Sequence, residues 1–347
     1  MIFRHFSPWT VTISMLLTMF VFGACEQSKA PDVSHIEVDT EIHRFDKELF
    51  AIDTVNYRQQ IDVLQEKYPD FFPLFTNQLM GFGAVQNPEK NYQKEISTFT
   101  INKDMLGLYD SVQIRYNDLS PIKEAFEQAF RYSKYYFPNK SLPKLVSYIG
   151  VFNPAALTIE GKQTVLAMNL DMYLGKNYPF YYPPEEFPVF LRKRFYAPYI
   201  VPNSLKAWAK AEYKLSKQEN KLLDQMIYEG KILYFLDLLL PETADALKIG
   251  YSAAELTWCK NNEFMVWEHL TPMLIDAKGI EFKPLLNEAP FTKGMPRNSP
   301  GRTPIWIGWQ IVKKYMAQHP ETTFDQLLQI KDGRQLLQAS KYKPKPN

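Results

Sequence analysis

The chain has 347 residues, with 40 Lys and Arg against 38 Asp and Glu, and a formal net charge of +2 at pH 7. This near balance provides no basic surface for nucleic acid, so we expect no nucleic-acid partner. The sequence has 2 cysteines, Cys25 and Cys259. If Cys25 carries a lipid, as argued next, no intramolecular disulfide can form.

The N-terminal residues predict a secretory signal. Arg4 supplies positive charge, and a nearly uninterrupted apolar run follows from Val11 to Phe22. A transmembrane helix needs about 20 apolar residues, so this run is too short to span a membrane. It ends at Phe22-Gly23-Ala24-Cys25, which resembles a lipobox, although Leu is usual where Phe22 stands. An uncleaved anchor is the alternative, which the polar residues directly after Cys25 disfavour.

This signal predicts the order of segments along the chain. We expect residues 1–24 to be a cleaved signal peptide and Cys25 to carry palmitate and anchor the protein to a membrane. Residues 25–34 are polar and contain Pro31, and we interpret them as the lipidated cysteine and its tether. Residues 35–347 are then a single domain.

The first half of that domain predicts a small sheet with helices. Apolar and acidic residues alternate over 36–42, which predicts a strand, and apolar residues recur at helical spacing over 57–68. Ser120-Pro121 begins a further predicted helix. Residues 144–152 and 157–169 are rich in β-branched and aromatic side chains, and Glu160-Gly161-Lys162 splits the second run into a predicted hairpin.

The second half predicts helices. Prolines over 179–202 allow only short ones, whereas Ser216 with Glu219 predicts a capping box that opens a long helix ending at Leu240. Ser252 with Glu255 predicts a second capping box and a helix through Trp267. A loop over 294–304 and helices over 305–316 and 322–339 complete the chain. The predicted class is α+β and predominantly helical, with a small N-terminal sheet and a larger helical half.

Motifs for hydrolysis are missing from the sequence. A zincin needs two His one helical turn apart in His-Glu-x-x-His, but the histidines at 5, 35, 43, 269 and 319 include no pair at a spacing of four. Gly250-Tyr251-Ser252-Ala253-Ala254 only approximates a nucleophile elbow. The N-cap role already accounts for Ser252, and we expect Cys259 to be a small buried apolar residue.

Glu229 is the most informative polar residue in the helical half. It interrupts the apolar run from Leu222 to Leu240, where a carboxylate needs a cationic or hydrogen-bonding partner. Arg297 and Arg302, in the loop after residue 294, are candidates for that partner. A buried structural ion pair is one interpretation, and a ligand site is the other.

Several separated blocks carry a resemblance. They include Tyr228-Glu229-Gly230-Lys231, Ala254-Glu255-Leu256-Thr257-Trp258-Cys259 with Trp267, Ser299-Pro300-Gly301-Arg302, and Ile307-Gly308-Trp309-Gln310. Arg44-Phe45-Asp46 and Arg192-Lys193-Arg194-Phe195 extend them toward the N-terminus. In this order the blocks resemble the gliding-motility lipoprotein B (GldB-like) family of Bacteroidetes, over most of the mature chain.

The resemblance implies a membrane-anchored, non-catalytic accessory of the gliding machinery that acts through motility or secretion proteins. We expect the anchor to lie in a cell membrane and to face the periplasm, because no acidic pair follows Cys25 directly. A weaker resemblance to zinc metallopeptidases implies a degenerate, zincin-like scaffold without its metal, since residues 184–206 contain no histidine. Under this interpretation the protein is a pseudoenzyme with no catalytic residue, metal or cofactor.

Two other functions stay open at this point. One is a metallopeptidase-like hydrolase that uses Glu229, and the other is a periplasmic module that binds peptide or glycan. The candidate cleft or partner-binding residues are Glu229, Arg302, Arg297, Trp306, Trp309, Trp267 and Arg192.

Overall fold

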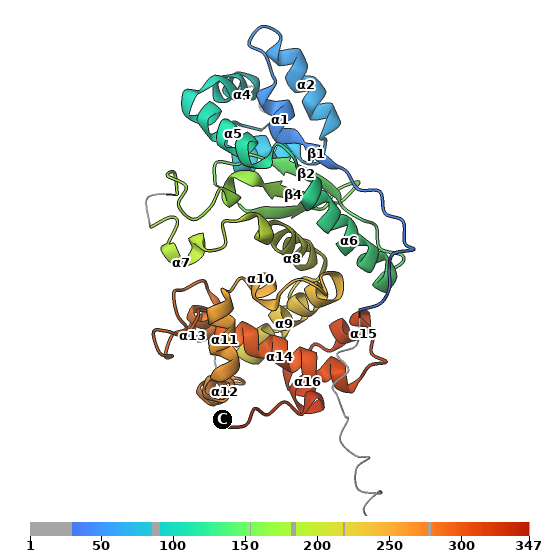
Figure 1. The fold of residues 1–347 in the computed structure, drawn as a ribbon, viewed down its shortest axis with the longest axis vertical. Coiled ribbons are helices and arrows are strands. Elements are labelled where there is room, and N and C mark those ends of the chain that lie inside the picture. The colour runs from blue at the N-terminus through green and yellow to red at the C-terminus, as the bar shows by residue number, and fades with distance from the viewer. Residues whose placement is uncertain are drawn as a thin grey trace, which may run out of the picture. The chain divides into compact units, whose positions relative to one another are not determined.

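The computed structural model describes residues 30–84, 91–152, 154–181, 185–217, 219–276 and 279–346. The chain divides into two compact units, residues 1–35 and 36–347. Among the described residues, every helix and strand belongs to the second unit (Figure 1). The predicted signal peptide, Cys25 and the first part of the predicted tether lie outside the described residues. The assignment of residues 35–347 to one domain stays a prediction.

A four-stranded sheet lies near the N-terminal end of this unit, in the order β1-β2-β4-β3. The strands are β1 (Ile42–Arg44), β2 (Lys144–Tyr148), β3 (Ala156–Ile159) and β4 (Val165–Asn169). β1, β2 and β4 run parallel, and β3 pairs antiparallel with β4. This last pair confirms the predicted hairpin.

The strand predicted over 36–42 is wrong in extent, because only Ile42 of that segment pairs. Ile42 lies opposite Leu145, and β2 begins one residue earlier, at Lys144. Pro143 precedes Lys144 and has no N–H to donate to a ladder, so the pairing cannot extend much further toward the N-terminus.

The two faces of the sheet support two cores. Val146, Tyr148, Val165 and Ala167 point into an aromatic core around Phe45. The ring of Phe45 makes edge-to-face contacts with neighbouring aromatic rings at centroid distances of 4.9–5.1 Å. The elements on this side are α1 (Phe45–Phe50), α2 (Tyr57–Lys67), α3 (Phe72–Leu74), η2 (Phe75–Leu79) and α4 (Tyr92–Ile101). α5 (Lys103–Tyr116) packs Met105 against this core, but its buried residues Leu108, Val112 and Tyr116 belong to the larger core.

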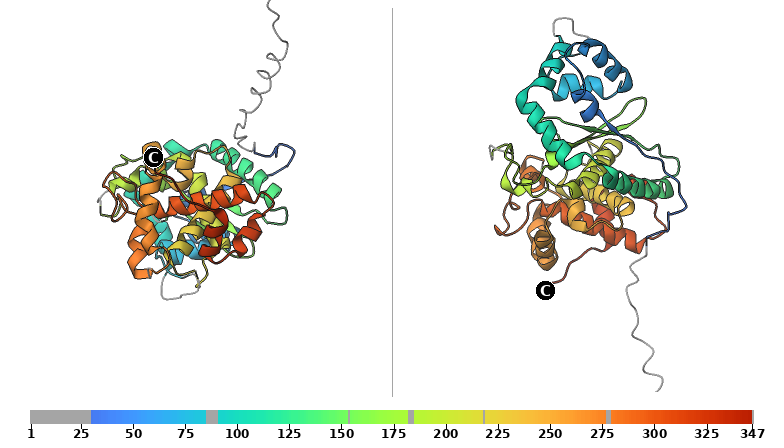
Figure 2. Two further views of the ribbon diagram at one scale, coloured as in Figure 1. Left: turned by 90° about the horizontal axis from the view of Figure 1, so that it is seen from below. Right: turned by 45° about the horizontal axis from the view of Figure 1, so that its top comes forward.

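The opposite face presents Leu145, Leu166 and Met168 to the larger core. Here α6 (Ser120–Tyr136) and α8 (Ile200–Glu212) pack, and α8 contacts both the sheet and α9 (Leu222–Leu239). Figure 1 shows α8 between the sheet and α9, and the right-hand view of Figure 2 shows the same order from another side. The helical half is therefore joined to the sheet mainly through α8.

The centre of the helical half is the contact between α9 and α14 (Thr303–Gln318), the most extensive contact between two helices among the described residues. A Cβ added at Gly230 would lie 2.5 Å from the backbone carbonyl carbon and oxygen of Gly308. Real Cβ atoms do not approach other atoms so closely, so glycine at 230 lets the two backbones meet.

The remaining elements are η3 (Leu170–Tyr173), α7 (Val189–Arg192), η4 (Ala197–Tyr199), α10 (Asp245–Ile249), α11 (Ala253–Asn261), α12 (Glu263–Leu270), η5 (Thr271–Met273), α13 (Gly279–Leu286), α15 (Phe324–Gln329) and α16 (Gly333–Ser340).

Most helix boundaries follow the predicted signals. The capping box at Ser252 and Glu255 is present, because the Ser252 backbone N–H donates to Glu255 Oε2 at 2.8 Å and Ser252 Oγ accepts from the Glu255 N–H at 3.3 Å. The helix predicted through Trp267 is two helices that meet at Asn262. The predicted start at Ser216 is wrong, since α9 begins at Leu222. Ser216 and Glu219 instead close a short turn, in which the Ser216 N–H donates to Glu219 Oε2 at 2.8 Å.

Cys259 is buried on α11 and free, as predicted. Burial raises the pKa of its thiol far above the ordinary value. Within the described ranges, the structure contains no helix with the length and apolar character needed to cross a membrane.

Candidate functional site

The four residues of the segment Tyr228–Lys231 of α9 lie in three different environments. Gly230 faces α14. Glu229 lines one pocket, whereas Tyr228 and Lys231 line another. This part of α9 therefore separates two polar pockets, and each of its residues has a distinct structural role.

The first pocket, here named the α8–α9–α14 pocket, has a volume of about 350 Å³. Its charged side chains come from α8, α9, the segment after α13 and the start of α14. Four aliphatic side chains and two carboxamides complete its lining. The charged residues are Lys206, Lys210, Glu229, Glu288 and Arg302; the others are Leu233, Ile249, Leu286, Ile305, Gln225 and Asn287.

Glu229 pairs across the interface between α8 and α9. Lys210 Nζ lies 2.6 Å from Glu229 Oε1, and the two side chains are 42% and 20% exposed. The predicted partners, Arg297 and Arg302, are wrong. Arg302, the N-cap residue of α14, pairs instead with Glu288, and Arg297 is exposed.

Arg302 and Arg194 both bind Glu288. Arg194 donates to the two carboxylate oxygens at 2.9 and 2.8 Å, a bidentate pair. Arg302 Nη1 lies 3.2 Å from Glu288 Oε1, and its Nη2 donates to the Ile249 carbonyl at 3.2 Å. Burial alone would raise the pKa of Glu288, but Arg302, Arg194 and Lys206 together hold it below its ordinary value. The carboxylate is therefore charged and fixed in position.

Lys206 differs from the other charged groups of this pocket. It is half-buried on α8, and within the described part of the chain no hydrogen bond or ion pair engages its ammonium group. Burial, together with the nearby positive charges of Arg302 and Lys210, lowers the pKa of Lys206 to about 7, and Glu229 opposes this shift only in part. A perturbed titratable group in a pocket is a recognised indicator of a functional site.

The other predicted site residues do not line this pocket. Trp306 and Trp309 are buried in the core, and Trp309 Nε1 donates to Asp237 Oδ2 at 2.7 Å. Trp267 packs edge-to-face on Tyr342 at a centroid distance of 5.3 Å. Arg192 is buried, and its Nε donates to the Phe187 carbonyl at 2.7 Å. Of the candidate residues, the pocket brings together Glu229 and Arg302.

Sequence reasoning missed Lys206, Lys210 and the role of Glu288. A signal was present, since Lys206 and Lys210 are one helical turn apart and so share a face of α8. Only short helices were predicted over 179–202, up to Pro202, and no helix with defined bounds was predicted for the residues directly after it. Pro202 lies in the first turn of α8, where a missing N–H is tolerated.

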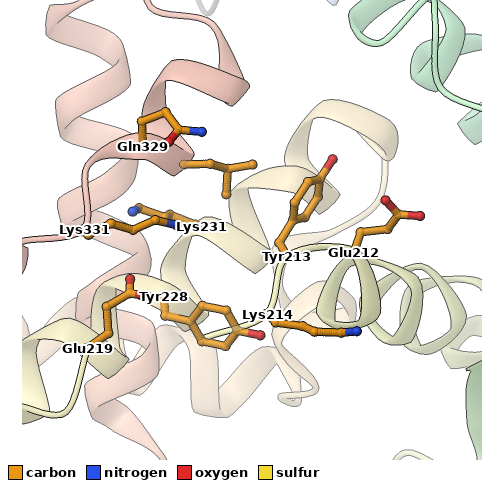
Figure 3. A pocket seen from close by; sticks show the side chains of 9 residues that line it. Glu212, Tyr213, Lys214, Glu219, Tyr228, Lys231, Gln329 and Lys331 are labelled. Carbon is orange, nitrogen blue, oxygen red and sulfur yellow. The ribbon is translucent and has the colours of Figure 1, made fainter. Parts of the chain in front are cut away.

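The second pocket, of about 200 Å³, lies on the other side of α9 (Figure 3). Lys231 is 3% exposed, and its ammonium group donates to the Ile330 carbonyl at 2.5 Å. In Figure 3 the side chains of Lys231 and Lys331 lie next to each other. Burial lowers the pKa of Lys231 to about 8; Glu219 opposes this shift, and Lys331 adds to it. Lys231 therefore already has a backbone partner, unlike Lys206.

No three His, Cys, Asp or Glu side chains among the described residues are close enough together to hold a metal ion. The predictions of no metal, no cofactor and no catalytic residue stay predictions, because the arrangement of protein groups alone does not test them.

The comparison with protein families gives one match. The sequence model of the family described as gliding motility protein GldB matches residues 26–344. The chain belongs to this family. The resemblance found in the sequence is thereby confirmed, and the GldB-family protein is associated with gliding motility as a lipoprotein. No curated protein and no solved structure matches the chain. The weaker resemblance to zinc metallopeptidases gains no support from these comparisons.

Proposed function

We propose that this GldB-family protein is a lipid-anchored, non-catalytic accessory of the gliding machinery that acts by binding partner proteins. Family membership supports the link to motility. The absence of a His-Glu-x-x-His motif from the sequence supports a role without peptidase chemistry.

The anchor in this proposal is Cys25. The short apolar run and the small residues before Cys25 support its acylation, and the family description is that of a lipoprotein. The folded unit would then lie at the surface of a cell membrane, facing the periplasm. Residues 26–34 would supply the spacing between the lipid and the folded unit.

The α8–α9–α14 pocket carries the proposal of partner binding. It holds the half-buried ammonium group of Lys206, which has no hydrogen-bond or ion-pair partner among the residues that the structure describes, beside two ion pairs. Fixed, mutually paired charges define a rigid polar surface, and an uncompensated charge inside it leaves electrostatic free energy to be gained when a complementary group enters. This arrangement is typical of a recognition site.

Photo-crosslinking in the gliding host tests this proposal. A photo-reactive amino acid replaces Lys210, which is at the exposed edge of the pocket, or Lys260, which is exposed on α11, in the full-length lipoprotein. We expect residue 210, but not residue 260, to crosslink to a protein whose own deletion stops gliding. Equal crosslinking at both positions, or crosslinking at neither, would contradict the proposal.

A further inference from the structure

Lys206 places an amine group inside the α8–α9–α14 pocket, and none of the described residues forms a hydrogen bond or ion pair with it. Glu229 is engaged by Lys210 at 2.6 Å, and Glu288 is engaged by Arg194 at 2.8 Å and by Arg302 at 3.2 Å. Both carboxylates of the pocket therefore already have cationic partners. The four nearby cations outnumber these two carboxylates, so the empty space is complementary to an anion.

The same pocket is partly apolar. Leu233, Ile249, Leu286 and Ile305 line it beside the charged groups, and the carboxamides of Gln225 and Asn287 can donate and accept hydrogen bonds. Inorganic phosphate would leave the aliphatic side chains without a contact. An occupant that presents a carboxylate, an amide and an aliphatic side chain close together would contact all three kinds of lining.

The size of the pocket restricts that occupant. Its volume of about 350 Å³ is near the lower end of the range for small-molecule sites, which begins at about 300 Å³. One terminal residue of a polypeptide fits this requirement best, because its carboxylate and its side chain are attached to the same Cα. An internal acidic residue would place its aliphatic neighbour on the next Cα, further from the charge.

We propose that the α8–α9–α14 pocket binds the C-terminal carboxylate of a partner polypeptide that ends in an aliphatic residue. Lys206 receives the carboxylate, and Arg302 adds to its attraction. Gln225 and Asn287 bind the last peptide group, and the aliphatic side chains of the pocket cover the terminal side chain. This inference rests on the proposed function, for which it names the kind of group recognised.

Peptide binding to the full-length lipoprotein in detergent tests the inference by calorimetry. The probes are acetyl-Gly-Leu as the free acid, its C-terminal amide, acetyl-Leu-Glu-amide, which carries a carboxylate only on its side chain, and inorganic phosphate. We expect the free acid to bind at least about tenfold more tightly than the other three, because a charge-assisted hydrogen bond contributes about 1.5–3 kcal/mol. Failure of the free acid to bind, or equal binding of any other probe, would overturn the inference.

Variants of Lys206 provide the control for folding. Lys206→Met should lose the preference for the free acid, Lys206→Arg should retain it, and Lys260→Met, on the exposed face of α11, should leave it unchanged. Circular dichroism shows whether each variant is folded. Unchanged binding in a folded Lys206→Met protein would contradict the inference, as would loss of binding in Lys260→Met. These results do not depend on gliding, so a failure here is distinguishable from a failure of crosslinking in cells.

Discussion

Gly308 of α14 lies so close to Met226 of α9 that a Cβ at Gly308 would stand 1.9 Å from the Met226 carbonyl oxygen. The Met226 carbonyl oxygen cannot move aside easily, because it is a backbone atom and both helices are buried at this contact. The contact also determines where Glu229 and Arg302 lie, since Glu229 belongs to α9 and Arg302 is the N-cap residue of α14. The shape of the α8–α9–α14 pocket therefore depends on two glycines.

Gly308→Ala should destabilise the fold strongly. Overpacking commonly costs about 1–3 kcal/mol and more where only backbone can yield, so we expect the free energy of unfolding in urea to fall by at least about 3 kcal/mol. Gly107→Ala on α5 is the matched control, because nothing lies within 4 Å of the added Cβ. It should stabilise the protein by up to about 1 kcal/mol through helix propensity. Similar effects at both positions would contradict this account of the contact.

Two carboxylates of α9 should differ in their contribution to stability. Glu229 and its partner Lys210 are partly exposed, so Glu229→Gln should cost less than about 1 kcal/mol. Asp237 pairs with Lys248, whose side chain is 3% exposed, at 2.8 Å and accepts from Trp309 Nε1. Asp237→Asn removes the nearer charged partner of that ammonium group and leaves Asp245, whose Oδ1 lies 3.5 Å from Lys248 Nζ. The variant should therefore cost about 1–3 kcal/mol, less than the complete loss of a buried partner. Urea unfolding measures the loss of unfolding free energy in each variant. An equal loss in both would show that side-chain exposure does not determine how much these ion pairs contribute to stability.

Asp171 should make stability depend on pH. Burial raises the pKa of Asp171 from 3.8 to about 7, although the Phe152 backbone N–H, donating to Oδ2 at 2.8 Å, opposes the shift. The folded state therefore holds the proton more tightly than the unfolded chain. The contribution of Asp171 is fully present below pH 3.8 and is lost as pH rises through about 7, by a total on the order of 4 kcal/mol.

The measurement is urea unfolding of the wild type and Asp171→Asn between pH 4 and pH 8, a window that spans most of this titration. The asparagine variant should lack the fall in unfolding free energy over that range, because its amide does not titrate. A fall of the same size in both proteins would assign the pH dependence to other groups.

Binding of a terminal carboxylate should also depend on pH. The bound anion favours the charged form of Lys206, whose pKa in the free protein is about 7, so the affinity should fall as pH rises above this value. The charged groups that face Lys206 are Lys210 on α8, Glu229 on α9, Arg302 at the N-cap of α14, Arg194, and Glu288 after α13. None of these neighbours has an ordinary pKa near 7. An affinity for acetyl-Gly-Leu that stays constant between pH 6 and pH 9 would contradict the role of Lys206.

The parts of the fold that sequence predicted are those set by local chemistry. The capping box at Ser252 and Glu255 involves residues three apart, and the end of α9 follows from Pro241, so short-range patterns were sufficient. The parallel pairing of Ile42 with Leu145 joins distant segments, and no local pattern contains it. The prediction of an α+β, mainly helical class was correct because that class depends on short-range sequence patterns.

The site was less predictable for the same reason. Glu229 was identified because a carboxylate stands out in an apolar helix, but its partner Lys210 became evident only from the packing of α8 on α9. Trp306 and Trp309 have the same local pattern whether they line a cleft or fill a core, and the structure buries both. Lys206 required knowledge of which charges remain unpaired, which is a property of the whole pocket.

The most direct test of the account is colony spreading by a deletion strain of the gliding host that expresses single-residue variants at wild-type levels. Lys206→Met removes the ammonium group from the α8–α9–α14 pocket, whereas Lys260→Met removes an exposed charge on α11. We predict that the strain with Lys260→Met spreads like the wild type and that the strain with Lys206→Met does not spread. Wild-type spreading with Lys206→Met, at equal protein levels in immunoblots, would contradict the claim that this pocket carries the function.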